Sequence, residues 1–211
     1  MIKLEINDKK YELPTSFDEL SFEKYCKAFY KLPKIESDEN DNIEFFKQSS
    51  EVESIILSRL LGEDDEFCLN LPLESYGKLL NAIQFLFDTD YLMKNAKAGI
   101  VIDKKRYSIP PMNEMTLRQY IDADVVMQEE ESDMQYIGLL SILLTSKDEK
   151  GKWIPYDGKY QEMVGKVKGL KCSEALPFVY HFFKRSHALQ KLSQVYMKAV
   201  ESQQPHNTKS S

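Results

Sequence analysis

The sequence repeats itself at a spacing close to 96 residues, and this repetition constrains the fold more than any other feature. Residues 4–13 (LEINDKKYEL) align with residues 100–109 (IVIDKKRYSI), so that Tyr11 matches Tyr107. A fixed period of this kind is the usual sign that a structural unit has been copied.

Three further pairs of segments follow in the same order along both halves of the chain. They are 19–25 with 114–120, 57–61 with 140–144, and 79–87 with 175–183. The third pair also aligns comparably after a shift of one residue. We therefore predict a tandem duplication, with a first repeat over 1–95, a second over 96–190, and a helix extension with a mobile tail over 191–211.

Each predicted repeat begins with a β-hairpin and continues with helices. Ile2, Leu4 and Ile6 alternate with polar residues, which is typical of a strand with one buried face. The turn is expected at 7–8 in the first repeat and at 103–104 in the second, where the residues tolerate positive φ. The predicted fold class is α+β and predominantly helical, built from two copies of a β-hairpin plus three helices.

Helix starts are marked by residues whose side-chain oxygens can accept hydrogen bonds from first-turn amides. The predicted N-caps are Ser21, Ser50 (with Glu53), Thr116 (with Gln119) and Ser132 (with Gln135), and the last helix is predicted to begin at Ser173.

Histidine and cysteine are too few and too dispersed to predict a metal site. His181 and His187 are six residues apart and face different sides of a helix, and His206 lies in the tail. The three cysteines, Cys26, Cys68 and Cys172, form no CxxC spacing. This pattern favours a reducing compartment over a disulfide framework.

The motifs of common enzyme sites are missing from the sequence. It contains no GxSxG elbow, no GxGxxG fingerprint and no GxxxxGK[ST] loop. Carboxylates occur as the runs EDDE (63–66) and EEES (129–132), which are typical of solvated loops and helix ends. We therefore expect no enzyme activity, no cofactor, and no catalytic, cofactor-binding or metal-binding residues.

Charge is distributed unevenly along a chain whose formal net charge is −6 and whose pI is near 5.3. The overall sign opposes binding to duplex nucleic acid. Residues 35–66 hold 11 acidic and 2 basic residues, whereas residues 147–198 hold 11 basic and 5 acidic ones. Two interpretations stay open: these segments dock oppositely charged partners, or they are solvated surfaces that keep the protein soluble.

The basic segment also contains aromatic residues. Trp153, Tyr156 and Tyr160 could stack on single-stranded nucleic acid beside Lys166, Lys168 and Lys171. The alternative is a turn or hairpin packed by these aromatics, because Asp157-Gly158 is a strong turn signal.

Two features bear on location. The first residues, MIKLEINDKKYEL, lack the apolar core of a secretory signal, and no stretch approaches the ~20 apolar residues that span a bilayer. The sequence thus predicts a soluble chain without a membrane span, made in the cytosol.

Four segments resemble small late-gene accessory and virion proteins of tailed bacteriophages, including tail-assembly chaperone-like proteins. They are INDKKYELP (6–14), DELSFEKY (18–25), LSRLLG (57–62) and LPLESYGKLLNAIQFLF (71–87). The duplicated form, rich in Lys, Asn, Asp and Tyr, is also similar to virion proteins of crAss-like phages.

The resemblance implies a structural or assembly role without an active site. The expected partners are other virion or tail proteins, or further copies of the chain. The expected location is the virion, and the host cytoplasm during assembly. Tyr196, in the C-terminal extension, is expected either to join a partner surface or to be buried. The alternatives are a transient tail-assembly chaperone and a protein associated with single-stranded nucleic acid.

Overall fold

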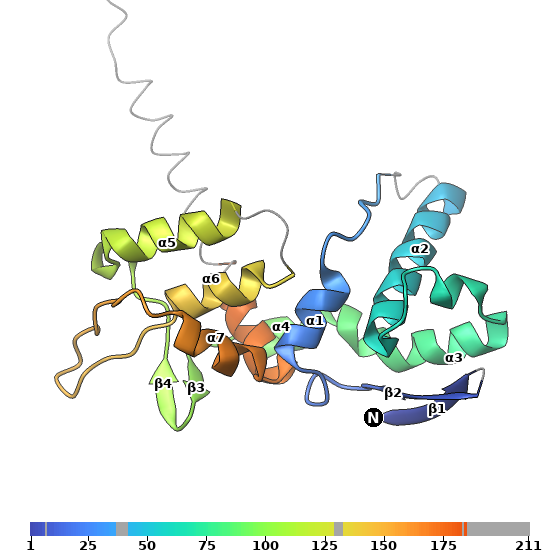
Figure 1. Ribbon diagram of the computed structural model, residues 1–211, viewed down its shortest axis with the longest axis horizontal. Helices are drawn as coiled ribbons and strands as arrows, with labels where there is room; N and C mark the ends of the chain where they lie inside the picture. The colour runs from blue at the N-terminus through green and yellow to red at the C-terminus, as the bar shows by residue number, and fades with distance from the viewer. Residues whose placement is uncertain (7, 37–41, 129–132, 183, 185–211) are drawn as a thin grey trace, which may run out of the picture.

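The computed structural model describes residues 1–6, 8–36, 42–128, 133–182 and 184, and its fold is α+β and predominantly helical (Figure 1). The strands and helices in chain order are β1 (Ile2–Ile6), β2 (Lys9–Leu13), α1 (Phe22–Phe29), α2 (Asn42–Leu61), α3 (Leu73–Ile83), α4 (Thr89–Lys94), β3 (Ile100–Ile102), β4 (Lys105–Tyr107), α5 (Leu117–Gln128), α6 (Gln135–Leu143), α7 (Gln161–Lys168) and a helical run over 172–182. Short 3-10 helices cover Phe67–Asn70, Gln84–Phe87 and Met112–Glu114. No helix within the described part of the chain has the length and apolar character to cross a bilayer.

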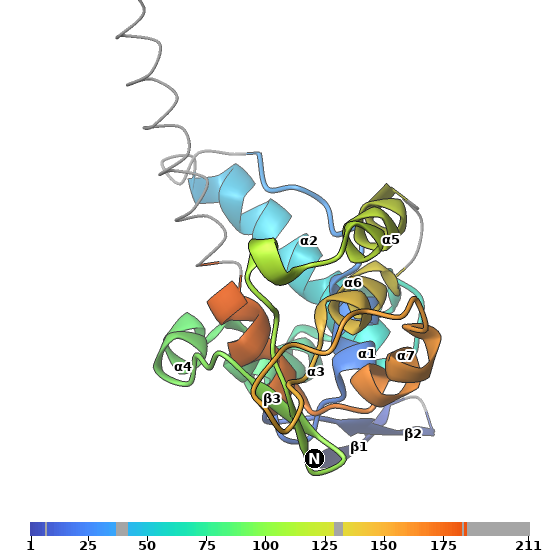
Figure 2. The ribbon, with the colours of Figure 1, turned by 90° about the vertical axis from the view of Figure 1, so that its left-hand side faces the viewer.

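Both predicted hairpins are present, and they share one register. Leu4 pairs with Tyr11 in the first, and Ile100 pairs with Tyr107 in the second. The predicted turn residues Asp8, Asp103 and Lys104 have φ of 62°, 50° and 66°. Asn7 lies outside the described residues. Both hairpins lie along the same lower edge of the molecule (Figures 1 and 2). The matching register supports the repeat, while the tandem duplication itself stays a prediction.

The first helix after each hairpin begins at its predicted cap. The Ser21 hydroxyl accepts from the amide of Lys24 at 3.3 Å, and the Thr116 hydroxyl accepts from the amide of Gln119 at 3.1 Å. The capping box at Thr116 is only half formed, because the Gln119 side chain is buried and donates instead to the Ile142 carbonyl at 2.8 Å. One side chain therefore links α5 to α6.

The predicted start of the second helix is wrong. α2 begins at Asn42, eight residues before Ser50, so Ser50 lies inside the helix. Glu44, Lys47 and Gln48 before Ser50 favour helix, and Gln48 donates to Glu44 one turn earlier at 3.1 Å. Ser132 lies outside the described residues, and α6 begins at Gln135. The last helical run includes residue 172, one residue before the predicted Ser173.

Residues of both halves form one hydrophobic core. The buried cluster includes Leu13, Ile56 and Ile83 from the first half, and Ile137 and Phe178 from the second. Each half has more helical segments than the three predicted, and α1 lies between the helices of the two halves (Figure 1).

The backbone also joins the two halves directly. The amide of Phe22 donates to the carbonyl of Leu170, and the amide of Cys172 donates to the carbonyl of Leu20, both at 2.8 Å. Close by, the Ser173 hydroxyl donates to Asp18 at 2.6 Å. These bonds fix the start of α1 against the start of the helical run 172–182.

Two helix glycines should respond oppositely to alanine. A Cβ at Gly77, in α3, would meet no atom within 4 Å, whereas a Cβ at Gly138, in α6, would lie 3.0 Å from Cγ1 of Val126 in α5. Gly77→Ala should therefore raise the free energy of unfolding by about 0.5–1 kcal/mol through helix propensity alone. Gly138→Ala should lower it, because crowding between packed helices costs about 1–3 kcal/mol.

Urea denaturation of both variants measures these changes. Val126→Ala and the double variant Gly138→Ala/Val126→Ala complete a double-mutant cycle. Because Val126 is buried, its own truncation also costs stability, but Gly138→Ala should cost less in the Val126→Ala background than in the wild type. Equal stabilisation by both glycine substitutions would contradict a close contact between α5 and α6.

Candidate functional site

An apolar pocket of about 340 Å³ lies where the two halves meet. Its walls come from α1, from α6, from the helical run 172–182 and from the segment after β4. The lining residues are Phe22, Tyr25, Cys26, Phe29, Ile109, Tyr136, Leu139, Leu140, Leu143, Leu176, Val179 and Phe182. A pocket with this lining suits an apolar ligand or apolar side chains of a partner.

The α1 wall follows from the spacing of its apolar residues. Phe22, Cys26 and Phe29 recur at intervals of four and three, which places them along one side of the helix. Phe22 and Cys26 are buried, and the rings of Tyr25 and Phe29 stack with centroids 4.3 Å apart. This stack gives the pocket a rigid aromatic edge.

The second half supplies the facing wall and the opening. Leu140 and Leu143 of α6 and Leu176 of the run 172–182 are buried. Tyr136, at the start of α6, is 50% exposed, and Val179 is only partly buried. The pocket therefore reaches the surface beside Tyr136.

Burial keeps the thiols at this seam protonated. It raises the pKa of Cys26 to about 12, and it raises the pKa of Cys172 as well. The Cys172 thiol donates to the Ser21 carbonyl at 3.4 Å. A thiol without thiolate character is a poor nucleophile and a poor metal ligand, so these cysteines serve as small apolar residues.

The structure describes one of the three histidines, His181. His181 lies on the run 172–182 and is partly buried, whereas His187, His206 and Tyr196 lie outside the described residues. The described residues contain no group of three or more His, Cys, Asp or Glu side chains placed to hold a metal ion.

The acidic run 63–66 ties the first hairpin to the end of α2. Glu63 pairs with Lys9 and accepts from the Tyr11 hydroxyl at 2.9 Å, and these hydrogen bonds lower the pKa of its carboxyl. Arg59 forms two hydrogen bonds of 2.7 Å to Asp65 and likewise lowers the pKa of that carboxyl. These acids therefore have structural partners, and the run 129–132 lies outside the described residues.

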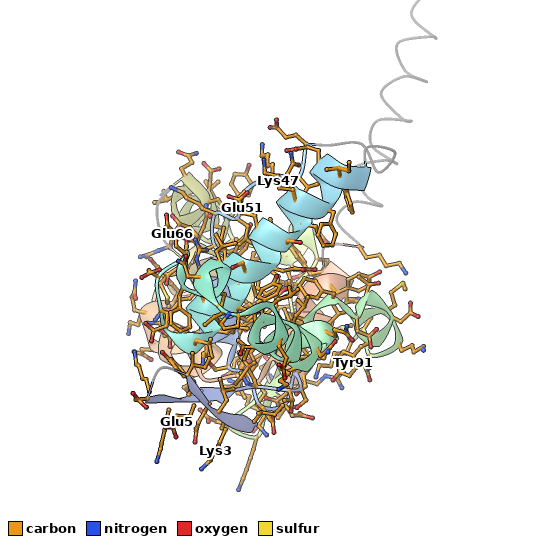
Figure 3. All side chains as sticks on the ribbon, turned by 90° about the vertical axis from the view of Figure 1, so that its right-hand side faces the viewer. Lys3, Glu5, Lys47, Glu51, Glu66 and Tyr91 are labelled. Carbon is orange, nitrogen blue, oxygen red and sulfur yellow. The ribbon has the colours of Figure 1, made fainter. Side chains whose placement is uncertain are left out.

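The acidic residues of α2 differ in exposure: Glu51 is exposed, whereas Glu44 and Glu53 are partly buried, and burial raises the pKa of the Glu53 carboxyl. Glu51 and Glu66 lie on the outer side of the first half, with Lys47 one turn before Glu51 (Figure 3). Lys3 and Glu5 project from the outer side of the hairpin in the same view. Charges of both signs thus alternate on this surface.

The first part of the basic segment, residues 147–158, forms turns, and the Trp153 and Tyr156 side chains there have intramolecular partners. Lys147 pairs with Trp153 in an isolated β-bridge, and the Lys147 ammonium lies 4.7 Å from the Trp153 ring centroid. The Tyr156 hydroxyl donates to Asp122 at 2.8 Å. Gly158, with φ of +84°, makes the predicted turn. These contacts leave less aromatic surface for stacking on bases.

Two of the three basic residues that would join such a surface already have ion-pair partners. Lys166 pairs with Asp103 at 2.7 Å, and Lys168 lies 3.9 Å from Glu23. The geometry therefore favours the apolar pocket over the basic segment as the functional site.

Comparisons with known proteins identify no relative of this chain. No family model matches the sequence, and no curated protein or solved structure gives a significant match.

Proposed function

We propose that this chain is a non-enzymatic structural or assembly protein of a tailed bacteriophage, which binds another virion protein through its helical surfaces. The partner is expected to place apolar side chains from a helix in the pocket between α1, α6 and the run 172–182. Helix-in-groove recognition of this kind uses apolar anchors at intervals of three and four residues.

The observation that carries this proposal is the chemistry of the pocket. Its lining is apolar and aromatic, it opens beside the half-exposed Tyr136, and its thiol is held protonated. When apolar side chains of a partner cover such a surface, the complex is stabilised by about 25 cal/mol per Å² of apolar surface removed from water. The phage assignment is supported by the four sequence segments over 6–14, 18–25, 57–62 and 71–87.

Site-specific photo-crosslinking from position 136 tests the binding. The photoreactive residue replaces Tyr136 in host cells that produce the phage, and mass spectrometry identifies the crosslinked protein. We expect one virion protein to be captured from position 136. The control places the photoreactive residue at position 46. Phe46 is 72% exposed on α2 and does not line the pocket, so this variant should capture that virion protein far less.

Mass spectrometry of purified particles separates the two phage roles. A structural protein stays in the virion, whereas a tail-assembly chaperone is captured before assembly and is absent from finished particles. If the chain is absent from particles and position 136 captures no virion protein, the proposal is wrong.

With the partner identified, one substitution measures how much the pocket contributes. Val179→Asp should weaken binding at least about tenfold, because a carboxylate in an apolar contact loses its hydration without gaining a partner. Leu73→Asp is the matched control, since Leu73 is 84% exposed on α3 and is not a lining residue. Equal affinities for both variants would place the partner elsewhere on the surface.

A further inference from the structure

The two hairpins carry the same lysine–tyrosine pair at the same position. Lys9 and Tyr11 in β2, and Lys105 and Tyr107 in β4, are two positions apart, so both side chains of each pair lie on one face of their strand. The Lys9 ammonium lies 5.3 Å from the Tyr11 ring centroid, and the Lys105 ammonium lies 5.6 Å from the Tyr107 ring centroid. Both hairpins therefore place a cation beside a tyrosine ring in the same way.

In the first hairpin this pair holds a carboxylate. Glu63, which follows the positive-φ Gly62 at the end of α2, pairs with Lys9 and accepts from the Tyr11 hydroxyl at 2.9 Å. The Glu63 side chain is only 19% exposed, and the two hydrogen bonds lower the pKa of its carboxyl. The lysine–tyrosine pair of the first hairpin is thus a carboxylate-binding site whose ligand comes from the chain itself.

In the second hairpin the corresponding pair has no carboxylate. The Lys105 side chain is exposed and Tyr107 is partly buried, and no residue in the described part of the chain forms an ion pair or hydrogen bond with either side chain. The nearest acid along the chain, Asp103, pairs with Lys166 of α7 at 2.7 Å instead. The ammonium and the hydroxyl that hold Glu63 in the first hairpin therefore have solvent-facing counterparts in the second.

The sequence accounts for this difference between the halves. Two residues after LSRLL (57–61) the first half has Glu63, and two residues after LSILL (140–144) the second half has Ser146. If the alignment shifts by one residue, the place falls on Thr145 or Lys147. None of these three residues carries a carboxylate, so the second half does not supply the group that the first half places at its hairpin.

The charge around the second pair is also unbalanced. Residues 8–11 together with Glu63 carry two basic and two acidic side chains, whereas residues 103–107 together with Lys166 carry four basic and one acidic. The turn of the second hairpin lies at the lower tip of the molecule, where a partner can approach it from solvent (Figures 1 and 2). An exposed positive excess of this kind is complementary to an acidic surface.

We propose that Lys105 and Tyr107 form a docking site for a carboxylate side chain in an acidic segment of a partner protein. The Lys105 ammonium and the Tyr107 hydroxyl both donate to this carboxylate, as Lys9 and Tyr11 donate to Glu63. A carboxylate is favoured over the phosphates of a nucleic acid, because it is the group that the first hairpin holds and because the net charge of −6 opposes a polyphosphate chain. This inference rests neither on the phage assignment nor on the apolar pocket.

Fluorescence anisotropy with a labelled hexaglutamate peptide tests this site in the full chain at low salt. Lys105→Gln should weaken binding about fivefold and Tyr107→Phe about threefold, because each removes one donor from an exposed site. Lys104→Gln is the matched control: it removes the same charge one residue away, and it should weaken binding less than about twofold. Equal weakening by Lys104→Gln and Lys105→Gln would mean diffuse attraction without a site and overturns the proposal, as does a wild-type chain that binds no peptide at millimolar concentration.

The first hairpin gives a reciprocal control, because its site is already filled by Glu63. Lys9→Gln should leave peptide binding unchanged and lower the midpoint of thermal unfolding, whereas Lys105→Gln should weaken peptide binding and leave the midpoint unchanged. Weaker peptide binding by Lys9→Gln equal to that of Lys105→Gln contradicts a specific role for the second hairpin.

A labelled oligothymidine of seven nucleotides, which carries six phosphates, distinguishes the two kinds of anion. It should bind more weakly than the hexaglutamate peptide. Tighter binding of the oligothymidine that is lost in Lys105→Gln would make phosphate the ligand, and the carboxylate assignment would then be wrong.

Discussion

Replacing Phe178 with alanine is expected to lower the free energy of unfolding by about 3–5 kcal/mol and to loosen both halves together. Phe178 is 2% exposed, and it belongs to the same buried cluster as Leu13 and Ile83 of the first half. Removing the ring deletes its dispersion contacts and leaves a cavity that the surrounding helices fill only partly. A loss of this size is a large share of the about 5–15 kcal/mol that stabilises a typical domain.

Hydrogen exchange distinguishes one folding unit from two. Because the core is continuous, amides of α3 in the first half should exchange faster in Phe178→Ala, by the factor that corresponds to the global loss of stability. Phe46→Ala is the matched control, since it removes the same ring from a 72% exposed position and should change stability by less than about 0.5 kcal/mol. Unchanged protection of α3 in Phe178→Ala would mean that the halves unfold independently.

The hairpins and the first helix of each half could be predicted because their signals are local. Alternating apolar residues and turn residues with positive φ determine the hairpins, and one hydroxyl marks each helix start. The pairings Leu4 with Tyr11 and Ile100 with Tyr107 agree with the alignment of the two halves. The fold class followed from these elements.

The start of α2 could not be predicted in this way, because two local signals compete. Ser50 with Glu53 has the pattern of a capping box, but the residues from Asn42 onward also favour helix. Once the helix extends to Asn42, Ser50 lies in the helix interior and has no first turn to cap. Its backbone carbonyl accepts a separate, tertiary hydrogen bond from the Tyr76 hydroxyl of α3 at 3.3 Å.

The pocket was missed because its walls come from distant parts of the chain. Phe22 and Leu176 are more than 150 residues apart in the sequence, and the backbone hydrogen bonds between 20–22 and 170–172 hold their segments side by side. The apolar spacing of α1 predicted a buried face but not what would cover it. The same limit applies to α5, whose apolar spacing does not show that Leu117 would be 74% exposed.

Raising the pH from 8 to 10 is expected to destabilise the protein through the buried thiols at the seam. In the folded state the pKa of Cys26 is raised to about 12 by burial, and that of Cys172 is also raised. Both thiols are protonated in both states below the ordinary thiol pKa, so they have no effect there. Above it the unfolded chain loses these protons while the folded chain keeps them, and stability falls as pH rises.

The size of this effect follows from proton linkage. For each thiol, the free energy of unfolding should fall by about 1.4 kcal/mol between pH 8 and pH 10. It should continue to fall until the pH approaches the folded-state pKa of that thiol. Urea denaturation at a series of pH values measures the slope. Cys26→Ala should reduce the slope between pH 8 and 10, whereas its packing cost should be the same at every pH. A slope that Cys26→Ala leaves unchanged would mean that solvent reaches this thiol. The α1 wall of the pocket would then be more open than the burial of Cys26 implies.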